Sequence, residues 1–200
     1  MTLNQKVKKV TELFDLLDKD LKQFATTTKL HCLVGCGKCC TKPDIEATVL
    51  EFLPLAMHYY MNGQAEIILE KLKAPNATCH VFVPTNLALG LGSCGNYNYR
   101  GLICRLFGMS AAKSRANDLQ LYTCANIKNT QPEEFARTVE QIKITRNVPM
   151  VTDYYQRLSS IDSLLASQYC PINEATRMAI EHVLNYYAYR RPPRGMAKAG

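Results

Sequence analysis

The hydrophobic pattern of the first 28 residues predicts one long amphipathic helix. Apolar residues recur at alternating steps of four and three, which places them on one continuous seam of a helix. Such a seam has to pack on something, either the protein's own helical core, a second copy of the chain or another protein partner. We favour the protein's own core, because that is the commoner outcome. The seam consists of Leu3, Val7, Val10, Phe14, Leu17, Leu21 and Phe24.

Helical periodicity returns further along the chain. Residues 44–61 are helix-like from Asp44 as a candidate N-cap, but Pro54 should kink or divide the segment. A shorter helix is predicted over residues 64–73. Pro132 is well placed in the first turn of a later helix, and two more helices follow it. Their apolar positions are Phe135, Val139 and Ile142, then Val151, Tyr154, Leu158, Ile161 and Leu165, and lastly, from Pro171, Ile172, Ala179, Ile180, Val183, Leu184 and Tyr187.

Residues 76–130 lack this periodicity. Five glycines interrupt them, and only His80–Val83 has the character of a short strand. The sequence therefore predicts a mainly α fold, a single helical domain over residues 1–190 with a loop-rich, cysteine-rich middle over residues 30–125. Residues 191–200 are basic and rich in Pro and Gly, so we expect a disordered tail there.

Charge and hydropathy restrict the functional classes. The net charge of +7 is moderate and spread along the chain, so nucleic-acid binding is not expected. No run of eighteen apolar residues is present, so no membrane span is predicted. Charges recur every few positions in the first twenty residues, without the apolar stretch of a signal peptide. This pattern favours a cytoplasmic protein.

Cysteine carries the candidate chemistry. Four of the nine cysteines lie within the run HCLVGCGKCC, and eight lie between residues 32 and 124. A disulfide framework is disfavoured, because cytoplasmic thiols stay reduced, the count is odd, and 200 residues can bury a core without such bridges. Thiols at this density favour a metal site. The predicted ligands are Cys32, Cys36, Cys39, Cys40, Cys79, Cys94, Cys104 and Cys124, whereas Cys170 is left out.

Spacing within the first run constrains the site further. Cys36 and Cys39 are separated by two residues and can chelate one ion from a loop, which Gly35 and Gly37 favour. The adjacent Cys39 and Cys40 can hardly serve one tetrahedral zinc without strain. One of the two therefore belongs to a second site, to a larger cluster or to no metal.

The type of ligand limits the metal. Thiolates select zinc, copper(I) or iron-sulfur clusters. Four thiolates on one divalent ion leave about two net negative charges, which nearby cations have to offset. Arg100 and Arg105 bracket Cys104 and are predicted to surround the site. His31 and His80 each adjoin a cysteine, but the surplus of thiols makes imidazole ligands unnecessary.

The two cysteine-bearing runs, HCLVGCGKCC and GSCGNYNYRGLICRLFG, resemble the YkgJ-type cysteine-cluster (CxxCxxCC) family, a proposed zinc- or iron-chelating domain. The resemblance covers about residues 30–125, with Gly101 where the family usually has proline. A related cluster in flagellin lysine N-methylases implies an iron-sulfur centre beside an enzyme function. The matching positions are Cys32, Cys36, Cys39, Cys40, Cys79, Gly92, Cys94, Tyr97, Arg100, Cys104, Arg105 and Phe107.

Three functional classes remain open. The first is an iron-sulfur or iron protein that transfers electrons or supports a modification reaction. The second is a zinc module that organises the middle region and presents a surface to a partner. The third is a copper or zinc chaperone or store, which we favour least because the thiols cluster in predicted loops. No nucleotide-binding loop or hydrolase triad assigns a reaction.

Overall fold

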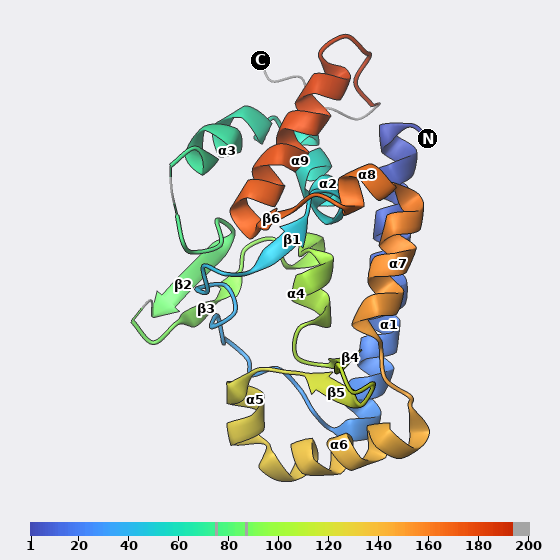
Figure 1. Cartoon of the computed structure of the whole chain (residues 1–200). Coiled ribbons are helices and arrows are strands. Elements are labelled where there is room, and N and C mark those ends of the chain that lie inside the picture. Colours follow the sequence, from blue (N-terminus) through green and yellow to red (C-terminus); the bar gives the residue numbers. More distant parts are fainter. Residues whose placement is uncertain (75, 87, 194–200) are drawn as a thin grey trace.

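The computed structural model describes residues 1–74, 76–86 and 88–193, and these residues form a mainly α-helical fold, as predicted (Figure 1). The remainder of the predicted tail, residues 194–200, lies outside the described residues. The helices are α1 (Leu3–Thr28), α2 (Leu53–Met61), α3 (Ala65–Leu72), α4 (Leu102–Leu106), α5 (Ala125–Thr130), α6 (Pro132–Thr145), α7 (Val151–Ile161), α8 (Ser163–Ala166) and α9 (Ile172–Tyr187). The strands are β1 (Glu46–Thr48), β2 (Phe82–Asn86), β3 (Leu91–Cys94), β4 (Ser110–Lys113), β5 (Leu119–Tyr122) and β6 (Tyr169–Pro171).

Helix α1 is the longest element and runs beside α7 (Figure 1). Thr2 and Gln5 form a capping box at its start, which satisfies two backbone N–H groups that have no partner within the helix. Most of the predicted apolar seam is buried against α2, α4 and α7, and Phe24 packs in a smaller cluster with Ala111 and Ile142. The prediction that the seam packs into the protein's own core is therefore confirmed. Within the described residues, no helix combines the length and apolar character needed to cross a membrane.

The segment between residues 44 and 61 differs from its prediction. Asp44 caps no helix, because residues 46–48 form strand β1, which pairs antiparallel with β6. A short 3-10 helix follows over Leu50–Phe52, and α2 then begins with Pro54 in its first turn. Proline lacks a backbone N–H, and the first turn of a helix is where that donor is not needed. Pro54 therefore marks the point where the segment is divided, which was one of the two predicted outcomes, and it kinks no helix.

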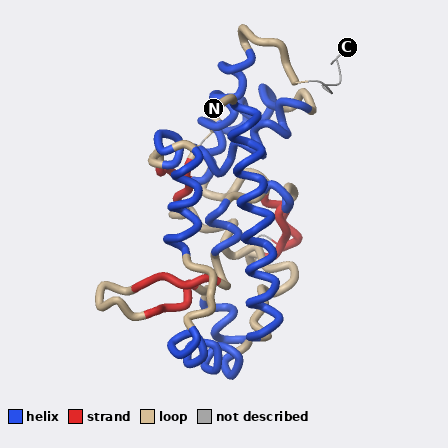
Figure 2. Tube along the Cα trace, turned by 90° about the vertical axis from the view of Figure 1, so that its right-hand side faces the viewer, coloured by secondary structure: helices blue, strands red, loops and turns tan. Residues whose placement is uncertain are grey.

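The middle of the chain contains more regular structure than its sequence indicates. The single predicted strand at 80–83 is shifted to β2, which pairs antiparallel with β3. A second hairpin joins β4 and β5, and it projects away from the helices in Figure 2. Helices α4 and α5 span five and six residues, too few for an apolar period to be recognised.

Glu51 connects the helical core to this middle region. Its side chain is fully buried, and burial raises the pKa of the carboxyl group. One carboxylate oxygen accepts hydrogen bonds from Thr48 N at 2.7 Å and Thr48 Oγ1 at 3.0 Å. The other accepts from Ile103 N at 2.8 Å, in the first turn of α4. Glu51 therefore satisfies donors from β1 and α4, two segments that are about fifty residues apart in the sequence.

We expect Glu51→Ala to lower the free energy of unfolding by about 3 kcal/mol, because it leaves the N–H groups of Thr48 and Ile103 buried without an acceptor. Glu51→Gln keeps one oxygen acceptor and should cost about half as much. Urea unfolding followed by circular dichroism measures both. Glu12→Ala, at an exposed surface ion pair, is the control and should cost about 0.5 kcal/mol or less. Equal losses for Glu51→Ala and Glu12→Ala would contradict this role.

Candidate metal centre

The first cysteine run folds as two successive tight turns. Cys36 N donates to Leu33 O at 3.2 Å, and Cys40 N donates to Gly37 O at 2.9 Å. Gly35 has a φ of +72°, a conformation that side chains with a Cβ rarely adopt. The sequence prediction that glycine places this run in a loop is therefore confirmed.

Backbone hydrogen bonds connect this loop to the β2–β3 hairpin and to the residues just before it. Gly37 N donates to Gly90 O at 3.0 Å, Gly92 N donates to Gly35 O at 2.9 Å, and Cys79 N donates to Cys40 O at 2.8 Å. The register of the hairpin places Phe82 opposite Cys94. The loop, Cys79 and Cys94 are therefore neighbours, although they are separated by up to about sixty residues.

Two glycines permit this close approach. A Cβ on Gly37 would lie 2.2 Å from Phe82 Cε2, and a Cβ on Gly92 would lie 2.5 Å from the same atom. The ring of Phe82 thus occupies the space that both glycines leave open. Its side chain joins the loop to the hairpin by packing, in addition to the backbone hydrogen bonds.

Helix α9 holds the segment that carries Cys79. The Asn173 side chain donates to Asn76 O at 3.0 Å and to Thr78 O at 2.8 Å, and its oxygen accepts from His80 N at 2.9 Å. One amide side chain from the last helix thereby satisfies three backbone groups around Cys79.

Four of the thiols form what we call the inner group: Cys40, Cys79, Cys94 and Cys104. Burial raises the pKa of Cys104 well above its ordinary value, and the Cys79 and Cys94 thiolates add to the effect. Burial likewise raises the pKa of Cys79 to about 11, with a contribution from Cys94. The pKa of Cys40 is raised chiefly because its S–H donates to Cys39, and further by burial, Cys79 and Cys104. These thiols are close enough to oppose one another's ionisation.

The other four thiols form what we call the outer group: Cys32, Cys36, Cys39 and Cys124. Burial raises the pKa of Cys32, and the thiolates of Cys36, Cys39 and Cys124 raise it further. The hydrogen bond from Cys40 lowers the pKa of Cys39 to about 6. Because Cys39 also opposes the ionisation of all four inner thiols, it is the residue at which the two groups meet.

Helix α5 supplies hydrogen-bond donors to the outer group. The Cys124 side chain is the N-cap of α5, and its Sγ accepts from Ile127 N at 3.5 Å. Asn126 Nδ2 donates to Cys36 Sγ at 3.4 Å. Hydrogen bonds to sulfur stabilise the thiolate form that binds metal. Asn126 was missed by sequence reasoning, and its place two residues after Cys124 was the only available signal.

The structure brings all eight predicted ligands into one region, and their role as ligands stays a prediction. All of them are free thiols. In the described part of the chain, no three Cys, His, Asp or Glu side chains stand in an arrangement that could already hold a metal ion. Binding therefore requires side-chain rotations and loss of protons. Cys170 lies apart, with its thiol 3.9 Å from Met178 Sδ.

The two neighbouring histidines are engaged elsewhere. His31 Nδ1 lies 3.1 Å from Lys29 O. The ring of His80 lies between Tyr59 Oη, at 3.3 Å, and Asn173 Oδ1, at 3.4 Å. Burial lowers the pKa of His80 to about 4, so the ring is neutral at neutral pH. Among the described residues, the surplus of thiols therefore leaves sulfur as the main donor available to a metal.

Arg100 is the cation that lowers the pKa of the largest number of these thiols. It favours ionisation of Cys32, Cys39 and Cys94. Its guanidinium carbon lies 4.0 Å above the ring of Tyr97. Its Nε is buried without a hydrogen-bond partner among the described residues. A buried donor beside thiols fits an acceptor such as a metal-bound sulfur.

Arg105 clamps the cysteine region to α1. Its side chain is 4% exposed and pairs with Asp18 of α1. It also donates to Arg100 O at 3.1 Å and Asn98 O at 2.7 Å, and its guanidinium carbon lies 4.5 Å over the ring of Phe14. Arg105 adds positive charge near Cys94, but its hydrogen bonds are used to fix the backbone before α4.

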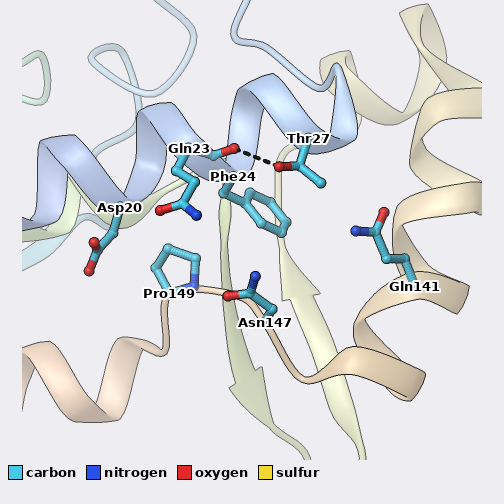
Figure 3. Close-up of a pocket in the computed structure, with 7 residues that line it drawn as sticks. All are labelled: Asp20, Gln23, Phe24, Thr27, Gln141, Asn147 and Pro149. Atoms are coloured by element: carbon cyan, nitrogen blue, oxygen red, sulfur yellow. Dashed lines mark hydrogen bonds between the residues drawn. The ribbon is translucent and has the colours of Figure 1, made fainter.

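A separate pocket of about 170 Å³ lies between α1, α6 and the loop that follows α6 (Figure 3). It contains the amide groups of Gln23, Gln141 and Asn147, together with Asp20. None of its lining residues is a cysteine or histidine, so it is no part of the thiol region.

The family comparison coincides with the thiol region. The family model CxxCxxCC, described as a proposed zinc- or iron-chelating domain, matches residues 31–131. The two ends of this range are joined, because His31 N donates to Gln131 Oε1 at 3.1 Å and Gln131 Nε2 donates to His31 O at 2.8 Å. Searches of the curated proteins and of the solved structures each find no match.

We expect Arg105→Met to lower the free energy of unfolding by about 3 kcal/mol, because two backbone carbonyls and Asp18 lose a buried donor. Asp18→Ala should cost only about 1 kcal/mol. Asp18 is 43% exposed, so water can take the place of its carboxylate beside Arg100 and Arg105. Chemical unfolding of both variants measures the difference. A larger loss for Asp18→Ala than for Arg105→Met would show that the ion pair outweighs the backbone hydrogen bonds.

Proposed function

Because the chain belongs to the CxxCxxCC family, we propose that its eight clustered cysteines bind metal as two four-thiolate sites, the inner and the outer group. The observation that carries this proposal is that the loop of Cys36–Cys40 is hydrogen-bonded on two sides. Cys79 N donates to Cys40 O at 2.8 Å, so Cys40 lies beside the inner thiols. Asn126 Nδ2 donates to Cys36 Sγ at 3.4 Å, so Cys36 lies beside the helix that Cys124 caps. The inner group already has four thiols with Cys40, and Cys39 completes four in the outer group.

We propose iron-sulfur centres as the occupants. Four cysteine thiolates per cluster are the usual ligands, and eight thiolates serve two clusters. No histidine takes part in either group, and donors reach sulfur from Asn126 Nδ2 and Ile127 N. Such donors and the positive charge of Arg100 favour the anionic, reduced state of a cluster and raise its potential. When bound, the clusters would supply one-electron chemistry, either for electron transfer or in support of a modification reaction.

Zinc is the second candidate, and the spacing of Cys36 and Cys39 favours it. Two cysteines separated by two residues are typical of tetrahedral structural zinc sites. Metal at both groups would then hold together short elements that bury little apolar surface on their own. In that case the protein would be an interaction module whose helices present a surface to a partner. Both candidates require the reducing conditions of a compartment such as the cytoplasm.

Metal analysis of protein purified without oxygen separates these candidates. Iron with an equal amount of acid-labile sulfide, up to about eight of each per chain, is the expected result. About two tightly held zinc ions without sulfide would replace the iron proposal by the zinc alternative. Copper(I) in place of both would favour the chaperone or storage class, and protein that retains no metal would refute the proposed site.

Single substitutions test the division into two groups. We expect Cys104→Ser to remove about half of the bound metal, and Cys124→Ser to remove the other half, because each variant breaks one four-thiolate site. The double variant should then retain almost none. Cys170→Ser is the matched control and should retain all of it. If Cys104→Ser alone empties the protein while its fold is preserved by circular dichroism, the eight thiols form one site, and the division is wrong.

A further inference from the structure

A second feature with binding capacity lies on α6, outside the thiol region. A groove of about 1280 Å³ opens between the β4–β5 hairpin, α6 and the first turn of α7. Residues of the hairpin line one side of the groove, and the hairpin itself projects from the helices in Figure 2. Neither the metal site nor the helical core accounts for this groove.

The floor of the groove is apolar. Leu119 and Leu121 line it from β5, Phe135 and Val139 line it from α6, and Met150 lies at the start of α7. All five side chains are half-buried. Leu119, Leu121 and Met150 also pack against the small core cluster beneath the hairpin. Water therefore covers only one side of this floor, and an apolar ligand would displace it favourably.

The rim of the groove is positively charged. Four exposed cations and two exposed carboxylates line it, so the balance is positive. Among the described residues, only one of the four cations has a carboxylate partner, Glu140, whose Oε1 lies 2.8 Å from a lysine Nζ. The cations are Lys113, Lys128, Lys143 and Arg146, and the carboxylates are Asp118 and Asp153.

We propose that this groove binds an acidic segment of a partner protein, with apolar side chains on the floor and carboxylates against the basic rim. The apolar floor and the excess of positive charge on the rim together select that chemistry. A nucleic acid fits less well, because the floor is mostly aliphatic and offers bases little surface to stack on. The only aromatic ring in the lining, Phe135, already lies 5.3 Å from the Lys128 ammonium.

The groove also adjoins the outer thiol group. Lys128 belongs to α5, and the N-cap of this six-residue helix is Cys124. A segment seated on the rim would therefore lie within about one helical turn of a proposed metal ligand. The chain's own last eleven residues do not suit the groove, because they carry four positive charges and no carboxylate side chain.

The test uses the full chain and a fluorescein-labelled twelve-residue peptide of Glu, Leu and Phe, with binding followed by fluorescence anisotropy. We expect saturable binding that weakens as salt is added. Replacing Lys113 and Lys128 together by Glu should weaken it about tenfold or more, because two attractive charges become repulsive. Val139→Ser should weaken it without changing the salt dependence.

Control variants and competitors decide the outcome. Lys9→Glu combined with Lys71→Glu changes the net charge equally at exposed residues outside the lining of the groove, and should change the affinity less than twofold. Equal weakening by both double variants, or no binding of the peptide, overturns the proposal. So does tighter, groove-dependent binding of a twelve-nucleotide single-stranded DNA, or equal binding of a peptide with Lys in place of Glu.

Discussion

The crowding of partly buried thiols is the constraint on which the middle of this molecule depends. Cys104 shows it most strongly, because burial first, and then the neighbouring sulfurs of Cys79, Cys39 and Cys94, disfavour its ionised form. Proteins keep such groups together as neutral thiols or by adding a cation, and the first choice gives up the ligand chemistry that sulfur offers. The arrangement is therefore electrostatically incomplete when it consists of thiolates alone. Arg100, with an unpaired buried Nε, supplies only part of the missing positive charge.

The helical body holds this region through a few polar contacts. Glu51 from the core satisfies the first turn of α4, and Arg105 returns from α4 to Asp18 on α1. Asn173 of α9 does the same for the segment around Cys79. Segments of four to six residues bury too little apolar surface to fix their own positions. Directional hydrogen bonds to backbone groups therefore replace packing as the means of alignment.

The sequence predicts elements whose signal is local. The seam of α1 repeats over 26 residues, and helices α6 and α9 begin where Pro132 and Pro171 indicate. The cysteine runs likewise indicated eight residues that the structure brings into one region, and their role as ligands stays a prediction. In contrast, β3, β4 and β5 span four residues each, which is too short for an alternating apolar pattern to be recognised. Glu51 could not be recognised from sequence, because its role is defined by an N–H group 52 residues away.

Asn173 also constrains the order of assembly. Its three hydrogen bonds are the contacts by which α9 reaches the backbone on either side of Cys79, so this segment is fully held only after the last helix has docked. During synthesis, the cysteines from Cys32 to Cys124 leave the ribosome before α9 exists. Helix α9 thus fixes the inner group late. The thiols are synthesised first, and their arrangement is completed only when α9 has docked.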